Sequence, residues 1–184
     1  MERIIKSMEE KYTDPALALV EDVFAQWDSP EEGRTVRKLV EEIRAKKYYV
    51  PELELIMVDE NDEITGYAMF SRFHIEGRYE DELLLLSPVA VRTDLQRQHI
   101  SKDLIEYGFR KASAMGFKAV LVEGNPQNYT SRGFRPSYLS GICAGANLHL
   151  PRPECLMVKE LEKGALDEMH GFVDYSFYEA LHTG

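Results

Sequence analysis

Apolar positions recur every three or four residues in the first quarter of the chain, which is the spacing of helices that bury one face. The pattern predicts one helix over about 16–25, starting after Thr13-Asp14-Pro15, where a capping residue stands beside a proline. It predicts a second helix that starts at Ser29-Pro30-Glu31-Glu32. Residues 2–8 fit a short strand ahead of both helices.

From Leu53 onward the apolar pattern becomes that of strands. Residues 53–58 and 64–70 predict a hairpin around a polar turn. A nine-residue apolar run, 83–91, predicts the fourth strand. Pro88 lies inside this run and has no N–H to donate, so we expect a bulge or a splayed edge near it.

A polar loop separates the fourth strand from a further helix. This helix is predicted over 100–115 and ends at Gly116, a position that favours a left-handed backbone. The next strand, 117–122, is expected to lie parallel to the fourth strand through a right-handed crossover. Residues 155–161 predict another strand, and the tail, 164–184, is expected to dock on the sheet through its aromatic residues.

The order strand, polar loop and helix in residues 83–115 is one that proteins use to bind anions. A helix N-terminus presents backbone N–H groups and the positive end of the helix dipole. Six basic and three acidic residues between Arg92 and Lys118 give this segment a local charge of +3, within a chain of net charge −10. The pattern favours a polyanionic ligand here and a cationic substrate elsewhere, and an ordinary solvated helix face is the alternative.

Length and composition limit the class of protein. With 184 residues, 44% of them hydrophobic, residues 1–184 fit a single domain with a substantial core. The negative charge argues against binding to nucleic acid or to a membrane surface. No apolar run is long enough to cross a bilayer and the chain begins with no signal peptide, so we expect a cytoplasmic protein. Cys143 and Cys155 are too few for a disulfide framework, and we expect no metal site.

Two segments resemble the GNAT N-acetyltransferase superfamily, in particular a small bacterial branch of predicted acetyltransferases. They are Leu86-Ser87-Pro88-Val89-Ala90-Val91 and Tyr129-Thr130-Ser131-Arg132-Gly133-Phe134-Arg135-Pro136. The order of elements around them also fits, so the resemblance covers roughly residues 3–163. It implies a mixed α/β fold, in which a mostly antiparallel sheet contains a splayed parallel pair (the fourth and fifth strands) and is flanked by helices.

The resemblance implies an enzyme that moves the acetyl group of acetyl-CoA to a primary amine of a small molecule or protein, by direct attack on the thioester. It places the coenzyme A pyrophosphate at the loop and first helical turn, formed by Gln96, Arg97, Gln98, His99, Ile100, Ser101 and Lys102. The backbone of Val89, Ala90 and Val91 would bind the pantetheine arm and face the thioester carbonyl. Asn125 is a further candidate for pantetheine, or for an Asx turn ahead of Pro126.

The resemblance also places the general acid at Tyr129, whose phenol is protonated at neutral pH. For the general base the sequence leaves three candidates. Glu123, at the end of the fifth strand, is the first choice, and His74 and Glu76 after the third strand are the alternatives.

The pyrophosphate loop departs from the family's pattern, Gln/Arg-x-x-Gly-x-Gly/Ala. The corresponding residues are Gln96-Arg97-Gln98-His99-Ile100-Ser101, so both small positions are changed. Glycine lets a backbone approach a phosphate closely, and a side chain at position 99 crowds that approach. A second interpretation is therefore a non-catalytic acyl-CoA sensor or interaction module on the same fold. A monomer or a homodimer is expected in either case.

Overall fold

The computed structural model describes residues 2–181, which form two compact units. The first unit comprises residues 2–71, 87–108 and 177–181, and the second comprises residues 72–86 and 109–176. Residue 1 and residues 182–184, the end of the predicted tail, lie outside the described residues. The single-domain organisation stays a prediction.

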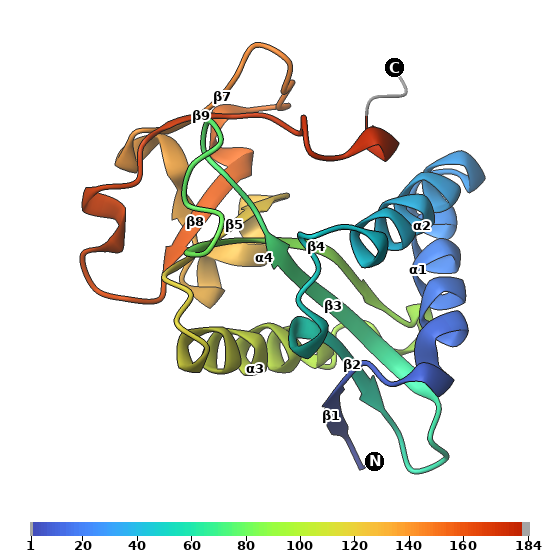
Figure 1. The fold of residues 1–184 in the computed structure, drawn as a ribbon. Helices are drawn as coiled ribbons and strands as arrows, with labels where there is room; N and C mark the ends of the chain where they lie inside the picture. Colours follow the sequence, from blue (N-terminus) through green and yellow to red (C-terminus); the bar gives the residue numbers. More distant parts are fainter. Residues whose placement is uncertain (1, 182–184) are drawn as a thin grey trace. The chain divides into compact units, whose positions relative to one another are not determined.

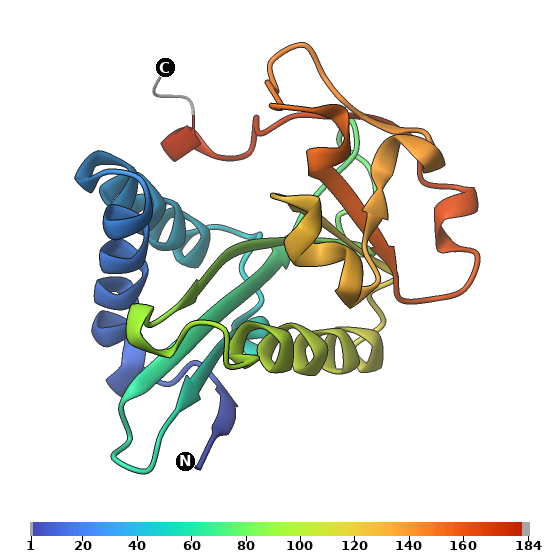
Figure 2. The same cartoon turned by 180° about the vertical axis from the view of Figure 1, so that it is seen from behind.

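The first unit combines an antiparallel sheet with three helices. Its elements are β1 (Ile4–Ser7), α1 (Thr13–Trp27), α2 (Pro30–Ala45), β2 (Glu54–Val58), β3 (Ile64–Arg72), the second half of β4 (Leu83–Val91) and most of α3 (Ile100–Ala114). The helices α1 and α2, drawn in blue, pack against each other in both views (Figures 1 and 2). The strands pair in the antiparallel order β1-β2-β3, with a register shift at Met57/Val58.

The helix boundaries follow from local chemistry. The second helix starts where it was predicted to, and Ser29 caps it by accepting the N–H of Glu32 at 3.1 Å. The predicted cap of α1 is wrong, because Thr13 lies inside the helix and a 3₁₀ turn, Glu10–Tyr12, leads directly into it. Trp27 ends α1 with 81% of its surface exposed.

The two faces of β3 contact different helices. Gly66 and Phe70 share one face, since successive side chains on a strand alternate. On that face Gly66 lies against the first turns of α3 and the Phe70 ring lies against Gly108 of the same helix. Tyr67 points to the opposite face, where it interacts with Arg44 of α2. The first unit therefore has helices on both faces of its sheet.

The second unit is built around a mixed sheet and a separate two-stranded sheet. The mixed sheet has the order β4-β5-β8-β6, and β7 pairs with β9 in the small sheet. The bounds are β5 (Ala119–Glu123), α4 (Pro126–Tyr129), β6 (Arg135–Pro136), β7 (Ile142–Ala144), β8 (Leu156–Glu160) and β9 (Gly171–Val173), together with the start of β4 and the end of α3. The predicted tail thus supplies a strand, β9, that runs parallel to β7.

The parallel pair of β4 and β5 confirms the sequence prediction. Their ladder runs from Leu83↔Ala119 to Leu85↔Leu121, and it stops ahead of Pro88 although β4 continues to Val91. The helix that connects them ends as predicted, with Gly116 at φ +95°. The fold is the expected mixed α/β arrangement, with a mostly antiparallel sheet and flanking helices.

Candidate functional site

The loop before α3 has a backbone conformation that side chains rarely adopt. Arg97 has a φ of +64° and His99 a φ of +65°, so both lie in the left-handed region. Such residues cost of order 1–3 kcal/mol each and cluster at ligand sites. His99 stands where the family pattern has glycine. The backbone therefore keeps the conformation that glycine favours although the residue has changed.

The helix itself begins at this loop. Its first helical hydrogen bond runs from the Asp103 N–H to the His99 carbonyl, at 3.0 Å. The N–H groups of the first turn precede that bond and so have no acceptor within the helix. They carry the positive end of the dipole of a 15-residue helix. This end of α3 can bind an anion.

Arg3 is a member of this site that sequence reasoning missed. Its guanidinium donates to the Gln98 carbonyl at 2.7 Å and to the Gln98 side-chain oxygen at 3.3 Å, and it lies 3.8 Å from Asp103. Arg3 therefore holds the loop and adds positive charge beside it. Arg3 and Gln98 are 95 positions apart in the sequence, so no local motif could have identified this contact.

The splayed end of β4 meets the same loop. The Gln96 side chain donates to the Val91 carbonyl at 3.5 Å. Ala90 is buried, whereas Val89 and Val91 are half-buried. The predicted cofactor-binding residues of β4 and of the loop are thus brought together within the first unit.

The predicted acid and base lie in the second unit, on either side of Gly124. Glu123 ends β5, and Tyr129 ends the short helix α4. The Tyr129 ring lies against Gly124 so closely that a Cβ there would be 2.6 Å from the ring edge. Phe134 contacts the same ring edge-to-face, with centroids 5.7 Å apart. Asn125 uses its side-chain oxygen to accept the Gln127 N–H, so the Asx turn forms.

The surroundings of Glu123 and Tyr129 shift the pKa of each side chain. Burial raises the pKa of Tyr129 above its usual value of 10, and the nearby Arg132 lowers it in part. The Glu123 residue retains solvent access, but protein atoms close to its carboxylate raise its pKa. The Tyr175 side chain lowers that pKa in part. Tyr129 therefore keeps its proton at neutral pH, and Glu123 is a stronger base than an ordinary glutamate.

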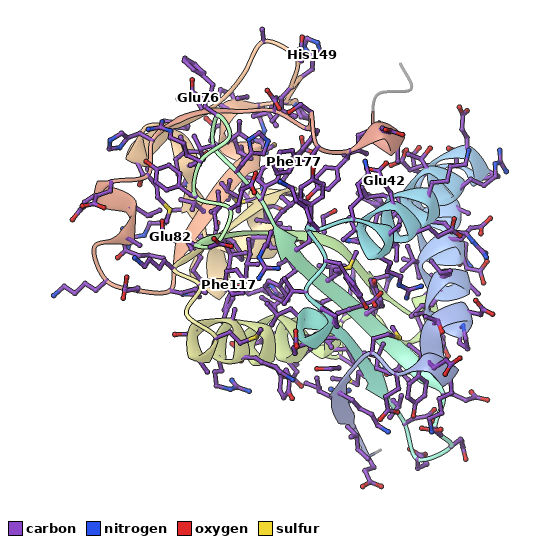
Figure 3. The ribbon with its side chains drawn as sticks, in the orientation of Figure 1. Glu42, Glu76, Glu82, Phe117, His149 and Phe177 are labelled. Carbon is purple, nitrogen blue, oxygen red and sulfur yellow. The ribbon has the colours of Figure 1, made fainter. Side chains whose placement is uncertain are left out.

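The two alternative bases have other contacts. The His74 ring accepts the Gly77 N–H at its Nδ1 atom, at 2.9 Å, so the neutral ring carries its proton on Nε2. That Nε2 atom is 3.8 Å from Asp174, and the residue is 4% exposed. Glu76 lies against the backbone of Gly171 in β9, and Figure 3 shows it on the loop beside that strand. The Glu76 carboxylate also lies 3.5 Å from the Arg78 guanidinium.

Among residues 2–181, no group of three or more His, Cys, Asp or Glu side chains is arranged to hold a metal ion. In the same part of the chain, no helix combines the length and apolar character needed to cross a membrane.

Comparison with known proteins places the chain in a family. The model of the acetyltransferase (GNAT) family matches residues 9–135. An uncharacterised N-acetyltransferase of Escherichia coli (strain K12), YhbS, is 27% identical over 142 residues, which are 75% of this chain and 79% of that protein.

Solved structures share the fold. The crystal structure of YhbS from Escherichia coli in complex with CoA has a TM-score of 0.81 and 21% identity, covering 94% of this chain and 88% of that chain. A GNAT family acetyltransferase from Brucella melitensis in complex with acetyl-CoA has a TM-score of 0.62 and 22% identity, over 73% and 83% of the two chains. Since the family model spans well over half of the sequence, the chain belongs to the acetyltransferase (GNAT) family, a family of acyltransferase enzymes.

Proposed function

We propose that this protein transfers the acetyl group of acetyl-CoA to a primary amine of a small molecule or protein by direct attack on the thioester. The family assignment and the CoA and acetyl-CoA in the related structures support acetyl-CoA as the donor. The resemblance to an N-acetyltransferase supports an amine as the acceptor. The net charge of −10 favours a cationic acceptor.

In this proposal the loop before α3 binds the pyrophosphate. The N–H groups of residues 97–102 would donate to the phosphate oxygens, while Arg97 and Lys102 add positive charge. The left-handed φ of His99 supports this role, because it preserves the backbone shape despite the lost glycine. The backbone of residues 89–91 would bind the pantetheine arm and polarise the thioester carbonyl.

The chemistry is assigned to Glu123 and Tyr129. The amine nitrogen attacks the thioester carbon, and Glu123 takes the proton that the nitrogen loses. As the tetrahedral intermediate collapses, the C–S bond breaks and the Tyr129 hydroxyl donates its proton to the departing thiolate. The observation that carries the proposal is the packing of the Tyr129 ring against Gly124, the residue that directly follows Glu123 at the end of β5.

The test is an assay of thiol release from acetyl-CoA with a panel of amines that includes a polyamine, an aminoglycoside, amino acids and a short peptide. Glu123→Gln and Tyr129→Phe should each lower turnover roughly a hundredfold or more while the calorimetric affinity for acetyl-CoA stays unchanged. Arg34→Ala, at an exposed arginine on α2, serves as the control and should turn over normally.

Two outcomes would contradict the enzyme proposal. If acetyl-CoA binds but no amine in the panel is acetylated, and Tyr129→Phe changes nothing, the sensor interpretation replaces it. If acetyl-CoA does not bind at millimolar concentration, both interpretations fall, because each requires the pyrophosphate loop.

A further inference from the structure

Arg3 holds the loop before α3 through two carbonyl groups of one residue. One terminal nitrogen of its guanidinium donates to the backbone carbonyl of Gln98 at 2.7 Å, and the other donates to the Gln98 side-chain oxygen at 3.3 Å. The first of these nitrogens also lies 3.8 Å from the Asp103 carboxylate. Because the guanidinium is a planar fork whose N–H groups point in fixed directions, these contacts hold Gln98 in one orientation.

The groups at both ends of this contact are themselves held in place. Arg3 directly precedes β1, whose four residues pair with β2. At the other end, the Asp103 N–H donates to the His99 carbonyl at 3.0 Å and so fixes the start of α3. Arg3 therefore connects a paired strand to the loop that opens this helix.

The bond to the Gln98 carbonyl also sets the direction of the next N–H group. The peptide bond between Gln98 and His99 is trans, and in a trans peptide the C=O and N–H bonds point in opposite directions. With the Gln98 oxygen held at Arg3, the His99 N–H must point away from the guanidinium. This N–H is one of the groups assigned to the phosphates above. Arg3 thus determines the direction of a donor that it does not touch.

This orientation of the peptide has a conformational cost at His99. The residue has a φ of +65°, in a region that is unfavourable for any residue with a Cβ. Turning the peptide plane by roughly half a turn would change the ψ of Gln98 and the φ of His99 together, and it would carry His99 to a negative φ. The same turn would break the Arg3 bond and point the carbonyl oxygen where the N–H had pointed. Arg3 opposes that turn.

We propose that Arg3 is a positioning residue for the pyrophosphate loop: by holding the Gln98 carbonyl, it keeps the His99 N–H directed at the phosphates although His99 carries a side chain. A glycine at position 99 would adopt either sign of φ without strain and would need less support. This inference rests on the proposed function, because it takes the loop to bind the pyrophosphate of acetyl-CoA. Arg3 touches no reacting atom in this scheme.

The first test measures the loop without any ligand. In protein labelled with ¹³C and ¹⁵N, the Cα and Cβ chemical shifts of His99 distinguish a left-handed from an extended backbone. Arg3→Met removes the donors and keeps an unbranched side chain, so it should move these shifts toward extended values. Arg34→Met, the same change at an exposed arginine of α2, should leave them as in wild type. Unchanged His99 shifts in Arg3→Met would overturn the inference.

The second test is calorimetric titration with acetyl-CoA at two salt concentrations. Arg3→Met should raise the Kd roughly tenfold or more, because the loop orientation that binds becomes a minor population. In a His99→Gly background the same change should raise the Kd about threefold or less, since glycine is not strained in either orientation. An equal loss in both backgrounds would overturn the positioning role, and a weaker salt dependence of Kd in Arg3→Met would then identify an effect of charge alone.

Turnover separates a failure of this inference from a failure of the proposed function. Arg3→Met should raise the KM for acetyl-CoA far more than it lowers kcat. If the wild type acetylates an amine and Arg3→Met has an unchanged KM, the proposed function stands and the positioning role is wrong. If the wild type binds acetyl-CoA and acetylates no amine, the enzyme proposal fails, and the pattern of Kd values decides the role of Arg3. If the wild type does not bind acetyl-CoA, both are wrong.

Discussion

Arg44 and Glu54 form an ion pair of 2.7 Å in which the Glu54 side chain has no exposed surface. Tyr67 donates a second hydrogen bond to this carboxylate at 2.6 Å, and Tyr49 donates a third. The negative charge is therefore fully satisfied by groups from α2, β3 and the connection between α2 and β2. Removing any one partner of a charge buried in this way destabilises the fold strongly, because no water can take the place of that partner.

Arg44→Ala should lower the free energy of unfolding by about 3–5 kcal/mol, since it leaves Glu54 charged and buried. Arg37→Ala is the matched control on the same helix, because Arg37 pairs with Glu21 and Glu41 at the surface. That change should cost at most about 1 kcal/mol. Urea unfolding followed by circular dichroism measures both, and equal losses would contradict the prediction.

Gly108→Ala should destabilise the protein although alanine is the better helix former. In an open helix this change stabilises by about 0.5–1 kcal/mol. Here the new Cβ would lie 2.1 Å from the Phe70 ring, so one of the two elements must shift. We expect a net loss of about 1–3 kcal/mol in urea unfolding. Ser113→Ala, at an exposed site of the same helix, should not destabilise, and a stabilised Gly108→Ala would show that the contact can relax.

The lowered pKa of His74 should make the stability of the fold depend on pH. Burial lowers its pKa below the usual 6.5, and Asp174 and Glu80 oppose this in part. The unfolded chain therefore takes up the proton more readily than the folded chain. The stabilisation that comes from keeping His74 neutral is complete above about pH 6.5. It is lost as the pH falls through the lower pKa that His74 has in the folded protein.

The variant that tests this is His74→Gln, which should flatten the fall in stability with acidification, as measured by urea unfolding at a series of pH values. His170→Gln, at an exposed histidine of the same unit, should leave the slope as in wild type. If both variants keep the wild-type slope, the acid sensitivity arises elsewhere.

His99 should respond to substitution according to its backbone angle. His99→Gly removes the Cβ from a left-handed residue and should raise the free energy of unfolding by up to about 1 kcal/mol. His99→Ile places a β-branched side chain there and should cost about 1–2 kcal/mol. Under the proposed function, calorimetry should show weaker acetyl-CoA binding for His99→Ile and undiminished binding for His99→Gly. Ser113→Ile is the control, because Ser113 is exposed on α3 away from the loop and is not among the residues with positive φ.

Local sequence patterns were sufficient to predict most of the helices and strands. The long strands and the three main helices have enough residues to display a period, and Ser29 and Gly116 mark ends through their own chemistry. The strands β6, β7 and β9 were missed because two or three residues display no period, and each forms only by pairing with distant chain. The cap predicted within Thr13-Asp14-Pro15 was wrong because these residues already lie inside α1, which continues directly from a 3₁₀ turn.

For the candidate site, sequence could indicate single positions but not their partners. Tyr129, Glu123 and the loop before α3 stand next to recognisable elements. Arg3 does not, since its contact with Gln98 joins residues 95 positions apart. A left-handed φ at His99 is likewise invisible in sequence, because histidine does not require it.

Trp27 has a practical consequence for all of these measurements. It is the single tryptophan of the chain, and at the end of α1 it is largely exposed, with an edge-to-face contact to Phe24. Its emission already reports a watery environment in the native state, so unfolding will change the fluorescence little. Titrations that follow this fluorophore would miss the transition. The buried Tyr67 and Tyr178, through near-ultraviolet dichroism, are the better optical probes of native packing. A tryptophan introduced at Phe177, which stacks on Tyr48 near Glu42 in Figure 3, would make the docking of the C-terminal segment visible.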